Sequence, residues 1–312
     1  MAQSEVELVK SVISPDGGTV DALPDLVAIF GGPLSSPSEI AAGSSPKSCR
    51  DAYVQWLTTN LPGDRSKVLM PESYEDWSNF NTYSDLLLFE ADLGYLTAAI
   101  VVFLEAFGSI AELGAFSQIE SLKDRLVIVV LGDRHPIKSF ISLGPLRQLE
   151  KKDTDSVCVV PARDETEILN DINVINAAVL KKKARNKTKR TFTPEDKQHQ
   201  FALALDLIAL IEVVTFTDIK LLFEHFQVSA NEHRILQILF TLEKSELIRK
   251  RRYGGIDYYA PATRGTRYLD FKGISPNEKF NRARLQVKVL TNRISTDREK
   301  VFQKFFPKGA DL

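Results

Sequence analysis

Residues 105–117 read Glu105-Ala-Phe-Gly-Ser-Ile-Ala-Glu112-Leu-Gly-Ala-Phe-Ser117, and this stretch decides the fold. An apolar run over residues 98–104 stops at Glu105, and the small residues that follow predict a helix from about Ser109. Open α/β sheets bind their ligands at such a junction, outside the carboxyl ends of the strands. Glu112 would lie in the first helical turn, beside unpaired backbone N–H groups and the positive end of the helix dipole. A carboxylate in that place stays ionised and can act as a nucleophile or as an electrostatic stabiliser.

A second interpretation of the same residues is purely structural. Ser109 and Glu112 have the S-x-x-E spacing of a capping box, in which Glu112 would bond back to the backbone N–H of Ser109. Three neighbours favour a functional site: Gly108 permits a sharp turn before the helix, Gly114 permits close approach to its backbone, and Glu105 adds a second carboxylate. From these residues alone, both interpretations stay open.

The motif Glu-x-x-Gly-Ser-x-x-Glu-Leu-Gly-Ala, from Glu105 to Ala115, resembles the nucleophile motif of nucleoside 2-deoxyribosyltransferases. In that family the glutamate, here Glu112, attacks the anomeric carbon of a sugar. The chain resembles more closely the effectors of bacterial retron anti-phage systems, in which a deoxyribosyltransferase-like domain precedes a winged-helix domain. Residues 107–117 and the segment Ser139-Phe-Ile-Ser-Leu-Gly-Pro-Leu-Arg147 carry this second resemblance.

The resemblance to retron effectors also implies partners and a task. It implies a toxin that the retron's reverse transcriptase and multicopy single-stranded DNA or RNA restrain until phage infection releases it. It further implies that the chain works within a higher-order assembly.

The length and composition fit two domains with real hydrophobic cores, since the chain has 312 residues of which 44% are hydrophobic. The N-terminus lacks the pattern of a secretory signal, and the apolar run 96–104 is far shorter than the roughly 20 residues of a membrane-spanning helix. We therefore expect a cytoplasmic protein without membrane contact. The two cysteines and four histidines show neither a disulfide framework nor metal-ligand spacing, so we expect no metal and no cofactor.

The net charge of −1 hides an asymmetry between the two halves of the chain. Residues 1–180 hold 13 Lys and Arg against 26 Asp and Glu, whereas residues 181–312 hold 27 against 15. Opposite charges favour separate tasks and make the basic half a candidate for binding a polyanion. The most basic run, 181–190, is expected within a linker over 181–196; alternatively, it continues a solvated helix.

The first half alternates apolar runs with helical patterns. Short β-branched runs predict buried strands at 25–30, 67–70, 98–104, 126–131 and 157–160. This alternation predicts an α/β fold with a parallel, Rossmann-like sheet, similar to that of the nucleoside deoxyribosyltransferases. We assign residues 1–24 to a loosely held arm and residues 25–180 to the N-glycosidase domain.

The second half is expected to be mainly helical. Helical patterns cover 201–214, 217–226 and 230–248. The Gly-Gly pair within 248–260 predicts a hairpin, and three helices with a hairpin indicate a winged-helix domain over 197–272. Within residues 273–312, a long basic helix is expected at about 277–306.

Further substrate contacts are expected near the strand ends. Backbone amides of Gly31 and Gly32, after the first strand, can receive a phosphate or a ribose. Carboxylates accept ribose hydroxyl groups, although solvent exposure is slightly favoured for Glu72 and Glu90. The expected substrate-binding residues are Phe30, Gly31, Gly32, Glu72, Glu90, Glu105, Gly108 and Ser109.

The first arm of the hairpin is the expected nucleic-acid surface. Its basic and aromatic side chains are Arg249, Lys250, Arg251, Arg252 and Tyr253. Phosphate contacts of this kind give affinity without sequence choice. The alternative is that the hairpin contacts a protein.

The expected reaction is cleavage of an N-glycosidic bond by a carboxylate nucleophile. A departing purine or pyrimidine usually needs a proton, whereas the nicotinamide of NAD leaves as a neutral ring. Glu112, with few other ionisable partners, therefore suits NAD as the substrate. The alternatives are a nucleoside or nucleotide N-glycosidase or deoxyribosyltransferase, and a non-enzymatic DNA-binding regulator that senses a nucleotide.

Overall fold

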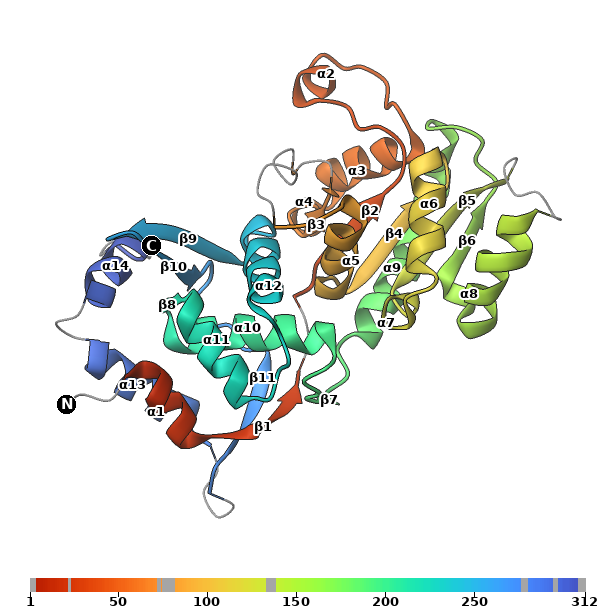
Figure 1. The fold of residues 1–312 in the computed structure, drawn as a ribbon. Coiled ribbons are helices and arrows are strands. Elements are labelled where there is room, and N and C mark those ends of the chain that lie inside the picture. The colour runs from red at the N-terminus through yellow and green to blue at the C-terminus, as the bar shows by residue number, and fades with distance from the viewer. Residues whose placement is uncertain are drawn as a thin grey trace. The chain divides into compact units, whose positions relative to one another are not determined.

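Two compact units make up the chain in a computed structural model, which describes residues 4–21, 24–71, 74, 82–132, 139–275, 280–293 and 297–307 (Figure 1). The α/β unit comprises residues 24–79 and 84–187. The helical unit comprises residues 1–23, 80–83 and 188–312. The chain therefore starts in the helical unit, runs through the α/β unit and returns.

The α/β unit is built on a five-stranded parallel sheet with the strand order β3-β2-β4-β5-β6. Its strands are β2 (Val27–Phe30), β3 (Val68–Leu69), β4 (Ala99–Phe103), β5 (Leu126–Leu131) and β6 (Val157–Val160). Each apolar run that predicts a strand forms one, so the predicted parallel α/β fold is confirmed. The central strand β4, which leads to Glu112, is buried along its whole length.

Helices cover both faces of this sheet, which explains why its strands are apolar throughout (Figure 1). The helices are α2 (Pro37–Ala41), α3 (Cys49–Asn60), α4 (Pro62–Arg65), α5 (Leu86–Leu96), α6 (Phe107–Phe116), α7 (Glu120–Lys123), η4 (Ser142–Leu146), α8 (Arg147–Lys152), η5 (Thr154–Ser156), η6 (Glu167–Asn170) and α9 (Ile172–Arg185). On one face, α3 and α9 pack against alternate strand residues such as Ile29 and Val101. On the other face, the rings of Phe30 in β2 and Phe116 in α6 meet edge to face, with centroids 5.1 Å apart.

The helical unit surrounds α10, whose residues 198–211 are all buried. Its helices are α1 (Glu5–Val12), α10 (Lys197–Ile211), α11 (Phe216–His225), α12 (Glu232–Lys244), α13 (Arg282–Arg293) and α14 (Asp297–Phe305). One antiparallel sheet contains β8 (Val214–Thr215), β10 (Ile256–Pro261) and β9 (Ile248–Tyr253), and another contains β11 (Leu269–Gly273), β1 (Ile13–Val20) and β7 (Arg190–Thr191). From α10 to β10, the order helix, strand, helix, helix and hairpin is the order of a winged helix. Gly254 and Gly255 turn the hairpin with φ values of 57° and 82°, which glycine adopts without strain.

The N-terminal residues do not form the loose arm that the sequence predicts. Residues 5–12 form α1, and residues 13–20 form β1, the central strand of the sheet β11-β1-β7. Gly18 allows a close strand pairing, because a Cβ at this position would collide with the backbone oxygen of Asp270 in β11. The α/β unit is thus inserted into the helical unit.

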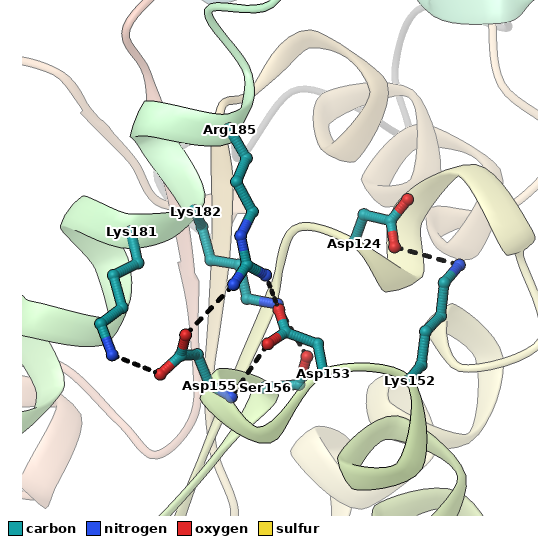
Figure 2. Close-up of polar contacts among 8 residues, drawn as sticks. All are labelled: Asp124, Lys152, Asp153, Asp155, Ser156, Lys181, Lys182 and Arg185. Atoms are coloured by element: carbon teal, nitrogen blue, oxygen red, sulfur yellow. Dashed lines mark hydrogen bonds and ion pairs between the residues drawn. The ribbon is translucent and has the colours of Figure 1, made fainter.

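The basic run at 181–190 is also not simply a linker, because its first residues complete α9 (Figure 2). The Nζ atom of Lys182 is buried and lies 2.5 Å from a carboxylate oxygen of Asp153. Lys181 pairs with Asp155 at 2.7 Å, and Arg185 contacts both aspartates. The alternative of a continued helix is therefore right as far as Arg185. Lys182 is buried in its ion pair, whereas Lys181 and Arg185 are paired with acids of the same unit and remain exposed.

The basic helix expected at about 277–306 is present as two helices, α13 and α14, within the described residues. Leu285 and Val289 of α13, and Val301 of α14, are buried as expected of apolar contacts. These helices pack as parts of the helical unit, so they are not a free basic extension.

Candidate active site and basic surface

The stretch 105–117 forms the predicted strand, loop and helix, but its helix starts earlier than expected. Helix α6 begins at Phe107, directly after Ala106 in the N-cap position. Ser109 is its third residue and is buried. The Ser109 hydroxyl accepts the N–H of Ala106 at 3.2 Å and donates to the Ala106 carbonyl oxygen at 2.8 Å. The serine therefore caps the helix from inside its first turn.

Glu112 is consequently the sixth residue of α6 and lies in its second turn. Two expectations change. The capping-box interpretation of Ser109 and Glu112 is wrong, since Ser109 does not hold the N-cap position. The positive end of the helix dipole also stabilises Glu112 less than expected, because that effect fades beyond the first turn.

The Glu112 side chain is half-buried, with its Oε2 atom buried, and it lies beside Gly108 one turn earlier. A Cβ at Gly108 would be 3.9 Å from Oε1 of Glu112. Gly108 is part of the helix rather than of a sharp turn before it, so its lack of a side chain matters here for a different reason. Because Gly108 has no side chain, the Oε1 atom of Glu112 lies next to the helix backbone with no Cβ between them.

Glu105 has a clear structural task at the end of β4. Its Oε1 atom accepts the N–H groups of Gly32 at 2.9 Å and Arg50 at 3.0 Å, and its Oε2 atom accepts the N–H of Cys49 at 2.8 Å. Cys49 and Arg50 open α3, where backbone N–H groups have no partner within the helix. Glu105 thus joins the loop after β2 to the start of α3.

Gly32, the second of the two glycines after β2, is held in this junction. A Cβ at Gly32 would lie 2.7 Å from the Cβ of Ser48 and 3.0 Å from the Glu105 carboxylate. The N–H of Gly32, expected to receive a phosphate or a ribose, is already donated to Glu105. Phe30 is fully buried against Phe116, so its side chain belongs to the core.

Of the other two carboxylates expected to bind substrate, the structure describes Glu90 but not Glu72. Glu90 lies on α5 and is buried, so the preference for solvent exposure is wrong for it. The helix α5 packs beside α6, which carries Glu112. Glu72 lies outside the described residues.

A cavity of about 260 Å³ opens at the carboxyl ends of β4 and β5, and the sequence did not reveal it. It is lined by Leu104, Glu105, Ala106, Phe107, Ile110, Val130, Ser139, Ile141, Ser142 and Leu146. Phe107 and Ile110 are three residues apart and share one face of α6, whereas Gly108 and Glu112 share another. Glu112 is not among the lining residues, so the candidate nucleophile and this cavity lie on different flanks of the helix.

The segment that carries the second resemblance forms the far wall of this cavity. Residues 142–146 make a π-helical turn that continues into α8 at Arg147. Pro145 lies inside this helix, and the wide turn accommodates a residue without an N–H. Phe140, beside the lining residues Ser139 and Ile141, is 87% exposed, and Phe107, which lines the cavity, is 95% exposed. The fold decides this exposure, so no local sequence pattern pointed to this surface.

The hairpin arm that is expected to bind nucleic acid has two faces, because strand residues alternate. On one face, the guanidinium of Arg251 lies 5.6 Å from the ring centroid of Phe305 in α14, and Arg249 donates to the backbone oxygen of Ala262 at 2.6 Å. On the other face, Asp257 lies 2.9 Å from Lys250 and 4.0 Å from Arg252. These cations are exposed, but each one also has a contact within the protein.

Tyr253, at the end of the same arm, lies under the Nζ of Lys304, 4.3 Å from the ring centroid. Its ring is therefore covered on one side by a cation of α14.

Several other arginines of the basic half are bound to acids inside the helical unit. The pairs are Arg264–Glu212 at 2.6 Å, Arg282–Asp206 at 2.5 Å, Arg293–Glu212 at 3.4 Å and Arg298–Asp218 at 2.9 Å. Asp206 is fully buried and also accepts the backbone N–H groups of Tyr268 and Leu269. These four arginines are therefore engaged within the protein, and the acids that pair with them are already included in the charge count of this half.

The described residues were compared with the requirements of a metal site and of a membrane-spanning helix. Within the described residues, no group of three or more His, Cys, Asp or Glu side chains is arranged to hold a metal ion. Among the described helices, none combines the length and the apolar character needed to cross a membrane.

Comparison with known proteins places these features in a family. Two proteins of Escherichia coli are similar over part of the chain, and the name of each proposes a ribosyltransferase and DNA-binding protein. The protein of retron Ec73 is 38% identical over 72 residues, which are 23% of this chain and 23% of the relative. The protein of retron Ec86 is 34% identical over 91 residues, which are 29% of this chain and 30% of the relative. The matched stretches thus span less than a third of either relative.

A longer match covers residues 46–250, which correspond to the family described as STM3845 retron effector protein. This match includes the whole of α6, the cavity wall and the helices α10, α11 and α12. The chain therefore belongs to the STM3845 family of retron effector proteins.

Proposed function

We propose that this retron effector is an N-glycosidase that hydrolyses the nicotinamide–ribose bond of NAD, with Glu112 as the nucleophile. The observation that carries the proposal is the position of this carboxylate. It is half-buried on α6, just past the carboxyl end of the central strand β4, beside Gly108 and outside the helix cap. Parallel α/β sheets bind their ligands at that edge.

The proposed reaction needs one carboxylate. An oxygen of Glu112 attacks C1 of the ribose through an oxocarbenium-like transition state, and the electron pair of the broken C–N bond leaves with nicotinamide. Because the nicotinamide ring is cationic in NAD, it departs neutral and needs no general acid. Water then hydrolyses the glycosyl–enzyme ester, which yields ADP-ribose, a proton and the regenerated carboxylate.

A second candidate is favoured by the names of the relatives, both of which mention a ribosyltransferase. A glycosyl–enzyme can pass its sugar to another base instead of to water. Under this alternative, a nucleoside or nucleotide is the substrate, and a second base is the acceptor.

The proposed regulation involves the rest of the retron. The reverse transcriptase and multicopy single-stranded DNA would hold the effector inactive, in a higher-order assembly, until phage infection. The exposed cations of β9, including Arg252, are the proposed contacts to nucleic acid. The names of both relatives include DNA binding.

The test is to incubate the purified protein with NAD, alone and with its retron partners, and to separate the products by chromatography. Nicotinamide and ADP-ribose should appear in equal amounts, with no metal added. Release of a free purine or pyrimidine from nucleotides, with NAD intact, would replace this proposal by the second candidate. Inertness toward both, in the absence of partners, would leave the sensing regulator as the better account.

A further inference from the structure

Helix α12 turns one face to the core and one face outward. Its core face consists of Ile235, Ile238, Leu239 and Leu242, all of which are buried. Its outward face consists of His233, Leu236, Gln237, Phe240, Thr241 and Lys244, by helical spacing. In helix-turn-helix proteins that bind DNA, the outward face of the corresponding helix enters the major groove.

Two residues in the middle of this outward face are nevertheless covered. Phe240 is 8% exposed and Thr241 is 0% exposed. The cover is Tyr83, whose hydroxyl oxygen lies 2.6 Å from Oγ1 of Thr241 and whose ring centroid is 5.9 Å from that of Phe240. The Tyr83 hydroxyl also donates to the backbone oxygen of Gln237 at 3.2 Å.

Thr82 extends the same contact by one residue. Its backbone oxygen accepts a hydrogen bond from Nε2 of Gln237 at 3.3 Å. Tyr83 is itself buried, so the pair Thr82–Tyr83, here called the strap, is bound to α12 by both its ring and its backbone.

The strap occupies a special place in the chain. Residues 80–83 belong to the helical unit, although the chain on either side, up to residue 79 and from residue 84, belongs to the α/β unit. Directly after the strap, Asp85 caps α5, which packs beside α6. The strap thus joins α12 to the segment of chain that leads into the α/β unit's own helices.

We propose that the strap and duplex nucleic acid compete for the outward face of α12. While Tyr83 covers Phe240 and Thr241, the helix cannot enter a groove, because the ring stands where base edges would have to lie. With the strap bound, nucleic acid meets only phosphate-binding cations such as Arg252, without sequence choice. The proposal does not depend on the chemistry of Glu112.

Thiol labelling tests whether the strap covers α12. Thr241→Cys replaces the covered hydroxyl by a thiol of similar size, and the protein's own Cys49 and Cys158 are buried. In this background, Tyr83→Ser should raise the rate at which the thiol at position 241 reacts with a maleimide by about tenfold or more. Tyr83→Phe, which keeps the ring and loses the hydroxyl, should give an intermediate rate.

The matched control is Leu236→Cys, at an exposed position of α12 outside the strap contact. Its labelling rate should be the same whether Tyr83 is present or replaced by Ser. Far-UV circular dichroism and its thermal transition show whether the helical unit, which contains all the substituted positions, stays folded in the variants. Equal labelling at position 241 with and without the Tyr83 ring would overturn the proposal.

The competition itself is measured with a labelled duplex of about 20 base pairs of mixed sequence. The Tyr83→Ser protein should bind this duplex about tenfold more tightly than the unaltered chain, with Tyr83→Phe between them. Unchanged affinity in a folded Tyr83→Ser protein with an accessible position 241 would show that α12 is not a nucleic-acid surface, and the proposal would fail.

Discussion

At the scale of single residues, two neighbouring glutamates have different tasks. Glu105 accepts three backbone N–H groups and holds the loop after β2 against the start of α3. Glu112 lies one helical turn beyond Gly108 and takes no part in the helix cap. The two can therefore be separated by substitution, since one is expected to affect stability and the other activity.

Replacing Glu112 by Gln should abolish glycosidic cleavage, because the amide has no nucleophilic carboxylate oxygen. The free energy of unfolding should change by less than about 0.5 kcal/mol, since Glu and Gln have similar helix propensities. Product chromatography and urea unfolding measure the two effects. A folded Glu112→Gln protein with full activity would remove Glu112 from the reaction.

Replacing Glu105 by Gln should lower the free energy of unfolding by about 2 kcal/mol, because three backbone donors lose a charged acceptor. The matched control is Glu120→Gln, whose carboxylate pairs with Lys123 and Lys152 at the surface. That change should cost much less stability, because water and salt screen exposed ion pairs. Urea unfolding at neutral pH compares them, and equal losses would mean that the Glu105 junction is not a special contact.

At the scale of elements, ion pairs connect the C-terminal end of α9 with η5 and its N-cap residue Asp153 (Figure 2). Partial burial raises the pKa of Asp153, but hydrogen bonds from Lys182 and Arg185 outweigh it and lower this pKa from 3.8 to about 2. A carboxyl group with a depressed pKa in the folded state stabilises the fold above its unfolded pKa. That stabilisation is lost as the pH falls from about 4 to about 2.

Urea unfolding should therefore show a loss of about 1 kcal/mol between pH 4 and pH 2 that is attributable to Asp153, because water screens part of its interaction with the two cations. The Asp153→Asn variant should be less stable at pH 7, because Lys182 stays buried without its carboxylate. It should also lose this part of the pH dependence. If stability depends on pH in the variant as it does in the unaltered protein, the pKa of Asp153 is not lowered by the fold.

The hairpin arm β9 gives a second prediction at this scale, because its cations alternate between two faces. Association with single-stranded DNA should weaken steeply as salt rises, through counterion release. Changing Lys250 and Arg252 to Ser should reduce the slope of log binding constant against log salt concentration by about one or two, since each cation contacts about one phosphate. The loss of stability should be small. Changing Arg249 and Arg251 to Ser should cost stability as well, since Arg249 bonds to Ala262 and Arg251 lies over Phe305.

Fluorescence anisotropy at two salt concentrations, together with thermal melting, separates these two pairs of substitutions. Chemistry at Glu112 should survive in both variants, because the arm belongs to the helical unit. Binding without salt dependence, or undiminished binding after loss of Lys250 and Arg252, would identify the arm as a protein contact.

At the scale of the whole molecule, the main feature is the insertion of one unit into another. The helical unit takes its central strand β1 from residues that precede the α/β unit in the chain. Neither unit is therefore a simple half of the sequence. The N-terminal segment also neutralises part of the basic charge of residues 181–312, since Arg298 lies 3.4 Å from Glu5 and Lys189 lies 3.0 Å from Asp21.

Deleting residues 1–20 should destabilise the helical unit, because β7 and β11 lose the strand between them. Far-UV circular dichroism should show an earlier thermal transition, whereas the fluorescence of Trp56, in α3 of the α/β unit, should change at nearly the same temperature as before. If the deletion shifts neither transition, β1 is not needed for the fold of its unit.

The sequence by itself determined the strands of the parallel sheet, the Gly254–Gly255 hairpin and the motif around Glu112. These features depend on local patterns: apolar runs, turn residues and the spacing of side chains along one element. The helix start at Phe107 escaped this reasoning, because Ala106 offers no side chain that announces an N-cap. Local pattern also left the capping and catalytic interpretations of Glu112 open.

Only the tertiary structure decided which charged and polar groups have partners within the protein and which distant segments pack together. The partners of Glu105 come from the loop after β2 and from α3, Tyr83 bonds to a threonine 158 positions later in the chain, and β1 pairs with β11. The physical reason is common to all three. A hydrogen bond, an ion pair or a strand pairing between distant residues forms only after the chain has folded, and no local sequence pattern records its partner.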